Sequence, residues 1–337
     1  MEKVKHEKKL KVAIIGIGNI GKHHARLSLK SPSAKLIAIC DTNSELLKEI
    51  CPDDVNSYVD FKEMLKAESD IEAVHICTPI NTHFEIALEC LNQGKHLLLE
   101  KPICANSKEA RTVLNKAIEK NLLLVPGHVE RFNPVLKPIR TLLSNKELGE
   151  ITSVIIRRVG LNPPEDKKAN ILFDLAVHDI DILLDLVKED LQTVFARGGE
   201  IEGDNRLDYC EIFLGFDRVN AIMQCNWITP IKIRKMNITG TKGYVEVDYL
   251  KQKFKFFRSA DQKNFDSFKE YVEFQKTNLA ENVFVTPEEP LKNEIEYFYS
   301  EIRKFQSGQS IDRKFPEDAV KTLSMVEKIL SNLDLID

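Results

Sequence analysis

Apolar and polar positions follow one pattern in the first part of the chain and a different one in the second. Up to about residue 125, short and almost wholly apolar runs alternate with segments whose apolar residues recur every three or four positions. The runs are typical of buried parallel strands, and the segments between them of amphipathic helices. This pattern predicts an α/β domain, a doubly wound parallel sheet of about six strands. Its clearest strands are at 11–15, 35–40, 73–77, 95–99 and 122–125, and its helices at 19–30, 44–50, 61–67, 82–92 and 107–120.

From about residue 150, one strand-like segment follows another with few helices between them. This arrangement predicts a second, mostly antiparallel open sheet of the α+β class. We expect a nucleotide-binding domain over residues 1–126 and an α+β substrate and oligomerisation domain over 127–337, with helix 317–333 as a segment that could pack back on the first domain. The predicted strands are at 151–159, 191–198, 208–215, 220–227, 235–239, 244–248, 253–258 and 270–275, and the helices at 171–186, 291–306 and 317–333.

The composition excludes several classes of protein. The 337 residues carry 48 basic and 52 acidic side chains, mixed along the chain, for a formal net charge of −4. A nucleic-acid partner is not expected, because such proteins concentrate basic residues in one field. No apolar run approaches the ~18–20 residues that span a bilayer, and no apolar segment follows the basic N-terminus, so neither membrane insertion nor a secretory signal is expected. Seven irregularly spaced cysteines without a CxxC pair indicate reduced thiols in a cytoplasmic protein, with neither disulfides nor a zinc cluster.

A glycine-rich segment directly follows the first strand and opens the first helix. In this context Gly16 allows a tight turn, Gly18 lets the backbone approach a pyrophosphate, and Gly21 lets the helix pack against the strand. Asp41 ends the second strand and could accept hydrogen bonds from both ribose hydroxyls of NAD, while repelling the 2′-phosphate of NADP. We therefore predict an NAD-binding Rossmann domain; the alternative is a glycine-rich turn with no ligand. The predicted cofactor-binding residues here are Gly16, Gly18, Asn19, Ile20, Gly21 and Asp41.

Two further motifs, CTPINTH at 77–83 and EKP at 100–102, follow the fourth and fifth strands. Ligands of open α/β sheets lie at the carboxyl ends of the strands, so Lys101 is expected near the nicotinamide end of the cofactor. Taken alone, a lysine at a strand end is more often simply solvated. The predicted cofactor-binding residues in these motifs are Thr78, Pro79, Asn81, His83, Glu100 and Lys101.

In this order and spacing, GIGNIG, CTPINTH and EKP resemble the Gfo/Idh/MocA oxidoreductase family, named after glucose-fructose oxidoreductase, inositol dehydrogenase and a rhizopine catabolism protein. The resemblance covers nearly the whole chain. It implies NAD(P)-dependent oxidation or reduction of sugar-like alcohols, with Lys101 as a catalytic residue. The family often assembles through its antiparallel sheet, so the resemblance also implies a homodimer or homotetramer.

The helix predicted at 171–186 is apolar nearly all round, with one polar stripe. At about 100° per residue, Asp174, His178, Asp181 and Asp185 fall on this stripe, and only Asp179 lies off it. Because Asp174 and His178 are four residues apart, the carboxylate can orient the imidazole and raise its basicity. The resemblance supports this pair as catalytic. A buried pair that merely satisfies itself is the alternative, and a metal site is not expected, because a third ligand is lacking.

Three segments bear on the substrate: GHVERFNP at 127–134, RRVG at 157–160 with two prolines after it, and DLAVHDID at 174–181. Together they resemble the branch of the family that oxidises the 3-hydroxyl of UDP-N-acetylglucosamine. That branch supplies a 3-keto sugar nucleotide to a PLP aminotransferase in lipid A biosynthesis. Of the consecutive Arg157 and Arg158, one faces inward, and arginines could pair with the diphosphate. The predicted substrate-binding residues are His128, Glu130, Arg131, Arg158, Asp174 and His178.

Several alternatives stay open. The substrate could be a free cyclitol or hexose, or a UDP-N-acetylglucosaminuronate, and a non-catalytic sensor of NAD or sugar is a minor possibility. Either Lys101 or His178 could be the formal base. The residues leave open whether NADH dissociates or is reoxidised in place, and how many subunits assemble.

Overall fold

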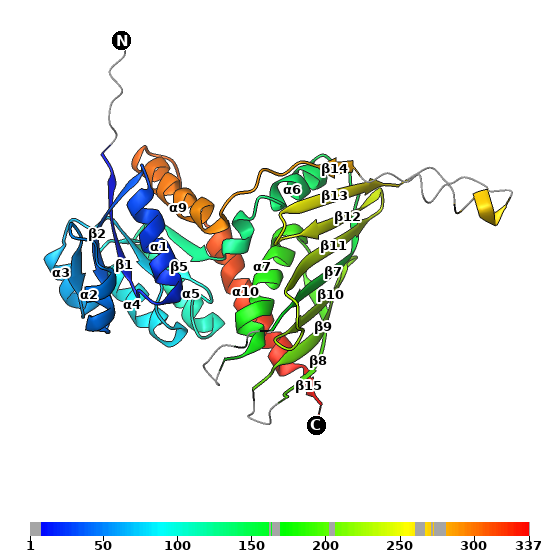
Figure 1. Ribbon diagram of the computed structural model, residues 1–337, viewed down its shortest axis with the longest axis horizontal. Coiled ribbons are helices and arrows are strands. Elements are labelled where there is room, and N and C mark those ends of the chain that lie inside the picture. The colour runs from blue at the N-terminus through cyan, green and yellow to red at the C-terminus, as the bar shows by residue number, and fades with distance from the viewer. Residues whose placement is uncertain are drawn as a thin grey trace, which may run out of the picture. The chain divides into compact units, whose positions relative to one another are not determined.

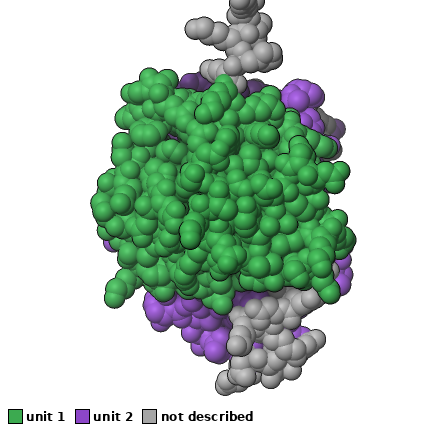
Figure 2. Space-filling model, turned by 90° about the vertical axis from the view of Figure 1, so that its left-hand side faces the viewer, with its two compact units in different colours: residues 1–129, 289–324 green, residues 130–288, 325–337 purple. Residues whose placement is uncertain are grey.

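The computed structural model describes residues 8–161, 163, 169–201, 206–259, 267–270, 272 and 281–336. The chain forms two compact units, shown in green and purple in Figure 2. The first consists of residues 1–129 and 289–324, and the second of residues 130–288 and 325–337. The sequence analysis expected one boundary at 126, with residues 127–337 in a second domain from which helix 317–333 could pack back on the first. In the structure the chain passes from the first unit to the second after residue 129, returns at residue 289 and passes again after residue 324.

The first unit contains a six-stranded parallel sheet with the order β3-β2-β1-β4-β5-β6, which confirms the doubly wound prediction. The strands are nearly continuous apolar runs, because helices cover both faces of such a sheet (Figure 1). The bounds are β1 Leu10–Ile15, β2 Ala34–Cys40, β3 Asn56–Tyr58, β4 Ala73–Ile76, β5 His96–Glu100 and β6 Leu124–Gly127.

Side-chain caps fix where several of the surrounding helices begin. Asn43, Asp60 and Asn106 each accept hydrogen bonds from backbone N–H groups in the first turn of the helix that follows. The helix α9, Pro290–Gln306, belongs to this unit although it is distant in sequence. The other helices are α1 Asn19–Lys30, α2 Ser44–Ile50, α3 Phe61–Ala67, α4 Ile80–Asn92 and α5 Ser107–Glu119; α10, Lys314–Ser331, contains the division between the units.

The second unit contains a mixed, mostly antiparallel sheet of nine described strands, with the order β14-β13-β12-β11-β7-β10-β9-β8-β15. Only the pairs β7·β10 and β8·β15 are parallel. The helix α7, Val177–Leu186, lies along one face of the sheet (Figure 1), and its apolar side chains pack with α6, Leu136–Ser144, in the core. The strands are β7 Ile151–Val159, β8 Leu191–Gly199, β9 Tyr209–Phe216, β10 Asn220–Asn226, β11 Ile233–Gly240, β12 Gly243–Asp248, β13 Lys253–Arg258, β14 Glu281–Val283 and β15 Leu333–Leu335.

Three features differ from the predictions. The helix expected at 171–186 begins with a π-helical turn, Leu172–Ala176, before the regular α7. The strand expected at 270–275 lies mostly outside the described residues, and its first residue, Glu270, is helical. The strands β3, β14 and β15 were not predicted, since three residues are too few to show an alternation. The helix α6 was not predicted either. Asn162 and Pro164 of the proline-containing motif, and the basic residues 1–7, lie outside the described residues.

All seven cysteines are free, as their irregular spacing predicts. Among the described residues, none of the helices combines the length and the apolar character needed to cross a membrane.

Candidate cofactor and active site

The glycine loop between β1 and α1 has a backbone that only glycine allows at two of its positions. Gly16 has φ +87°, and a Cβ there would lie 2.7–2.8 Å from the backbone of Cys77 and Thr78. A Cβ on Gly21 would lie 1.9 Å from the carbonyl oxygen of Gly16. A Cβ on Gly18, by contrast, would meet nothing within 4 Å. Gly16 and Gly21 therefore serve the packing of the loop, and Gly18 leaves open space beside it.

This open space lies at an uncapped helix N-terminus. Gly18 is the N-cap of α1 and has no side chain to bind the first amides, and the first turn carries no acidic residue. Residues 18–20 are exposed. Free amides and the positive end of the helix dipole favour an anion at this point. The loop therefore fits the pyrophosphate of a dinucleotide.

Asp41, at the end of β2, is joined to the glycine loop. One carboxylate oxygen accepts the backbone N–H of Ile17 at 2.7 Å, and the other accepts that of Asn43 at 2.9 Å. The side chain is half-buried, and each oxygen keeps a further lone pair for an exposed partner. Asp41 can thus support the loop and still accept a hydrogen bond from a ribose hydroxyl.

His83 connects the two motifs that follow β4 and β5. Its Nε2 lies 2.7 Å from the carbonyl oxygen of Thr78, and its Nδ1 lies 2.9 Å from that of Pro102. The ring is 1% exposed, and burial lowers the pKa of His83 despite these two carbonyl groups, which favour the charged form. His83 therefore lies between the backbones of the two loops, and its one ring proton bonds one of the two carbonyl oxygens.

Glu100 ends β5, next to the cis peptide bond between Lys101 and Pro102. Its Oε1 lies 3.0 Å from Nε2 of His24, and its Oε2 accepts the backbone N–H of Lys101 at 3.1 Å. Burial acts to raise the pKa of Glu100, but the His24 hydrogen bond, the Lys101 N–H and the Lys101 charge outweigh it and lower the pKa. Glu100 is thus a buried carboxylate that holds the backbone of Lys101, whose own side chain is partly exposed.

In the second unit, the π-helical turn carries Asp174, and α7 carries His178 one turn later. Both side chains are partly exposed, among neighbours that are mostly buried. Asp174 Oδ2 accepts a hydrogen bond from the indole N–H of Trp227 at 3.3 Å. Single π-helical turns inside α-helices are frequent at functional sites. Asp174 and His178 therefore lie where the helix changes from a π-helical turn to a regular α-helix.

The remaining acidic residues of α7 hold arginines. Arg131 donates to both carboxylate oxygens of Asp181, at 2.6 and 2.9 Å. Arg158 donates to both oxygens of Asp179, at 2.7 Å each. All four side chains are buried. Burial acts to lower the pKa of Arg158, but Asp179 outweighs it and raises that pKa.

These ion pairs change the picture of the predicted substrate-binding residues. The two arginines have carboxylate partners within the unit, and Arg158 also pairs with Glu130 at 3.0 Å. The geometry therefore supports a role of both arginines in fixing α7. His128, which lies in the first unit, is buried with its ring near Phe315. Asp179, which the helical periodicity placed off the polar stripe, is a buried partner of Arg158 that the sequence analysis missed.

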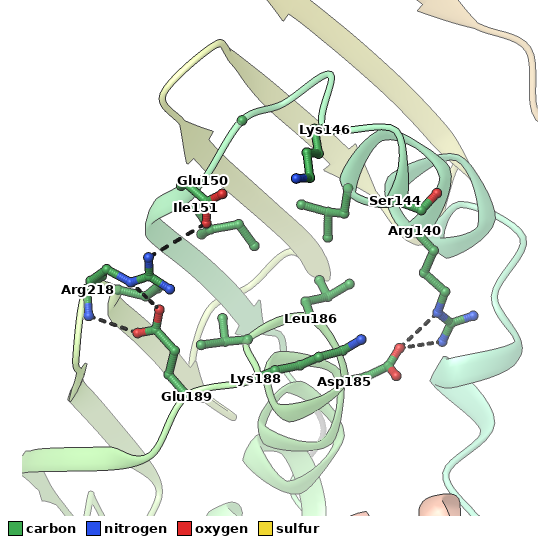
Figure 3. Close-up of a pocket in the computed structure, with 14 residues that line it drawn as sticks. Arg140, Ser144, Lys146, Glu150, Ile151, Asp185, Leu186, Lys188, Glu189 and Arg218 are labelled. Carbon is green, nitrogen blue, oxygen red and sulfur yellow. Dashed lines mark hydrogen bonds and ion pairs between the residues drawn. The ribbon is translucent and has the colours of Figure 1, made fainter.

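A pocket of about 530 Å³ also lies in the second unit, between the ends of α6 and α7 and the β9–β10 turn (Figure 3). Its walls carry three ion pairs: Arg140 with Asp185, and Arg218 with both Glu189 and Glu150. None of the residues predicted for catalysis or binding lines this pocket.

Comparison with known proteins decides the family. Residues 10–128 match the oxidoreductase family with an NAD-binding Rossmann fold named Gfo/Idh/MocA, and residues 136–246 match the C-terminal domain of the same family. This chain belongs to the Gfo/Idh/MocA oxidoreductase family. The family resemblance, the fold class and the NAD-binding Rossmann domain expected from the motifs are thereby confirmed.

The relatives include enzymes with different substrates. A UDP-N-acetylglucosamine 3-dehydrogenase from Acidithiobacillus ferrooxidans is 26% identical over 242 residues, 72% of this chain and 74% of the relative. A myo-inositol 2-dehydrogenase from Thermotoga maritima is 27% identical over 195 residues, 56% of this chain and 58% of the relative. An uncharacterised oxidoreductase from Bacillus subtilis is likewise matched over 58% of its length.

Two solved structures share the fold over nearly the whole chain. The structure of the Acidithiobacillus ferrooxidans enzyme has a TM-score of 0.81 at 21% identity and covers 97% of this chain and 98% of its own. A 3-ketoreductase from Actinomadura kijaniata, in complex with NADP and TDP-benzene, has a TM-score of 0.82 at 18% identity and covers 98% of this chain and 99% of its own. At these identities the similarity is one of fold.

Proposed function

We propose that this protein uses NAD to oxidise the 3-hydroxyl of UDP-N-acetylglucosamine. The observation that carries the proposal is the alignment with a UDP-N-acetylglucosamine 3-dehydrogenase, which extends over 72% of the chain. The motifs at 127–134, 157–160 and 174–181 support the same substrate. The second candidate is an inositol dehydrogenase, favoured by relatives of similar identity. If UDP-N-acetylglucosamine is the substrate, the 3-keto product would pass to a PLP aminotransferase for lipid A biosynthesis. We place this reaction in the cytoplasm, where free cysteines are stable.

NAD, bound by the glycine loop and by Asp41, would supply the hydride acceptor. The space beside Gly18 fits the pyrophosphate, and the Asp41 carboxylate favours a ribose hydroxyl over a 2′-phosphate. The motif residues Thr78, Pro79 and Asn81 complete the proposed cofactor site, with His83 and Glu100 holding its loops.

For the reacting hydroxyl, we propose that His178 takes the proton and that the ammonium of Lys101 stabilises the developing negative charge on oxygen. Asp174 would orient the imidazole of His178. Positioned acid–base groups contribute about 10²–10⁴-fold to such reactions. The proposed role of Arg131 and Arg158 is to hold α7, and with it His178, through Asp181 and Asp179.

A homo-oligomer is also proposed. On the sheet face opposite α7, Ile155, Ile222, Phe213 and Phe195 are cross-strand neighbours and form an apolar row. Ile155, Ile222 and Phe195 are 48–56% exposed. An exposed apolar row of this kind is typical of an interface between copies. Light scattering on the wild type and an Ile222→Asp variant tests it: the wild type should be a dimer or tetramer and the variant smaller.

The activity is tested by absorbance of NADH with purified protein, NAD and UDP-N-acetylglucosamine. A ketone trap, or the aminotransferase with glutamate, draws the unfavourable oxidation forward. Free N-acetylglucosamine, myo-inositol and the UDP-uronate are run alongside. A signal with the UDP-sugar alone supports the proposal, whereas a signal with free polyols alone contradicts it and favours the second candidate.

A further inference from the structure

A chain of buried hydrogen bonds lies behind Glu100 in the first unit. The Ser28 hydroxyl is 2.8 Å from that of Tyr299, which is 3.1 Å from Nε2 of His75. Nδ1 of His75 is 3.0 Å from Nδ1 of His24, and Nε2 of His24 is 3.0 Å from Glu100. The members come from α1, β4, β5 and α9, and all are buried.

The chemistry of the members fixes the end of this chain at Glu100. An ionised Glu100 only accepts, so Nε2 of His24 must donate to it. Burial, together with the neighbouring His24, keeps the pKa of His75 well below its usual value, so His75 is neutral and has one ring proton for its contacts with His24 and Tyr299. Burial raises the pKa of Tyr299, so its hydroxyl keeps its proton. The chain therefore links the Tyr299 hydroxyl to the Glu100 carboxylate through two imidazole rings.

The end of the chain lies next to Lys101. The carboxylate that receives the His24 proton on one oxygen accepts the Lys101 N–H on the other. Gly127 on β6 packs against it, because a Cβ there would lie 2.8 Å from Cα of Glu100 and 3.0 Å from its Cδ. The carboxylate plane is thus fixed on three sides, and any rotation of it would move the backbone of Lys101.

A second buried carboxylate lies beside the His24 end of this chain. Glu294 on α9 is fully buried, and its ligand atoms, those of His24 and those of Glu100 lie within 4.8 Å of one another. Two acidic side chains therefore surround one histidine. The hydrogen bond of 3.0 Å commits the proton on Nε2 of His24 to Glu100.

We propose that His24, His75 and Tyr299 are positioning residues for Lys101, acting through the Glu100 carboxylate. The inference rests on the proposed function of Lys101 at the reacting hydroxyl. In the proposed function these three residues contact neither NAD nor the sugar, so the inference gives them a role that the proposed function does not. Buried hydrogen-bond networks can carry energetic coupling between residues that do not touch.

The test removes a hydroxyl at the far end of the chain. Tyr299→Phe keeps the ring and deletes the hydroxyl that bonds His75. Tyr58→Phe is the matched control, since its hydroxyl bonds Glu68 at 2.7 Å in the same unit, outside the chain. We expect Tyr299→Phe to lower kcat by about three- to tenfold, with KM and NADH binding within twofold of the wild type, and Tyr58→Phe to leave all three unchanged.

A second measurement needs no turnover. The rate at which acetic anhydride acetylates Lys101 at fixed pH, followed by peptide mass spectrometry, reports the surroundings of this amine directly. It should change by about twofold or more in Tyr299→Phe and not in Tyr58→Phe. If the wild type oxidises none of the sugars, the proposed function fails and this comparison alone decides the inference. Equal acetylation rates in the folded Tyr299→Phe variant and the wild type overturn it.

If Tyr299→Phe does not fold, substitutions at His24 carry the test. His24→Gln keeps an N–H for Glu100, whereas His24→Leu removes it. The inference expects the glutamine variant to retain kcat and Lys101 acetylation within about threefold, and the leucine variant to lose more than about tenfold in kcat. Identical behaviour of the two variants would contradict it.

Discussion

The carboxylate of Asp41 accepts the backbone N–H of Ile17 at 2.7 Å and so joins the end of β2 to the glycine loop. An Asp41→Asn variant loses the charge but keeps one oxygen as an acceptor for this N–H. We expect NAD to bind about tenfold more weakly and NADP no more weakly, since the repulsion of a 2′-phosphate is gone. Titration with each cofactor checks this, with the exposed Asp53→Asn as control. Unchanged NAD affinity would remove Asp41 from the proposed site.

Substitutions at two glycines of the loop should affect different properties: Gly16→Ala the stability, and Gly18→Ala the affinity for NAD. Gly16→Ala places a Cβ against Cys77 at φ +87°, which should cost about 1–3 kcal/mol of stability and lower Tm. Gly18→Ala has open space and φ −68°, so Tm without cofactor should stay near that of the wild type. The added methyl group should nevertheless weaken NAD binding by about tenfold or more, because it occupies the space proposed for the pyrophosphate. Thermal melts and NAD titration together check this pair; a Gly18→Ala variant with normal affinity contradicts it.

His178→Ala should leave the fold and NAD binding intact and reduce turnover by about 10²–10⁴-fold. The reason is that an imidazole is proposed to take the proton from the reacting hydroxyl. Steady-state rates and NAD titration on the same preparation give the comparison. A control is His23→Ala, which alters an exposed histidine of α1. Normal turnover in His178→Ala would show that another group, with Lys101 foremost, is the base.

Breaking the buried ion pair of Arg158 and Asp179 should lower the free energy of unfolding, because the pair holds α7, the helix that carries His178. Asp179→Asn leaves the buried Arg158 with the Glu130 carboxylate as its charged partner, which should lower the free energy of unfolding by about 1–3 kcal/mol. Urea unfolding measures it. The exposed pair of Lys62 and Glu85 is the control, and removing Glu85 should have no measurable effect. An equal result for the two variants would mean that the pair does not hold α7.

His96 should make the first unit sensitive to acid. Its Nδ1 accepts the backbone N–H of Leu123 at 2.9 Å, and burial lowers the pKa of His96 to about 4. The unfolded chain binds this proton near pH 6.5, so the contribution to stability is fully present above that pH and disappears as the pH falls to about 4. The difference is about 3 kcal/mol. His96→Asn, which keeps an acceptor, should flatten the decline of unfolding free energy between these pH values, and an unaltered slope would contradict this.

The sequence predicted what is local and missed what depends on distant partners. The glycine loop, Asp41 and the EKP motif follow directly after strands, so their placement could be inferred from the order of elements. The pairing of Arg158 with Asp179 joins a strand to a helix 21 residues away, and no periodicity encodes it.

The helical stripe shows the same limit in another form. Its construction assumed 100° per residue throughout, but the π-helical turn at Leu172–Ala176 changes the phase before α7 begins. The sequence analysis placed Asp181 on the polar stripe and Asp179 off it by assuming a regular α-helix, and the helix is not regular along its whole length. The buried chain from Tyr299 to Glu100 escaped prediction because Tyr299 lies 224 residues from His75.

The first unit is built from two stretches of sequence, residues 1–129 and 289–324. During synthesis the ribosome releases its sheet early, while α9, with the hydroxyl of Tyr299 and the buried Glu294, emerges only after the whole of residues 130–288. Until α9 emerges, the part of the sheet that α9 covers stays exposed, and exposed apolar surface makes a partly synthesised chain prone to aggregation. Completion of the first unit is therefore one of the last events in the making of this protein, and a chain that stops before α9 is a natural substrate for chaperones and proteases.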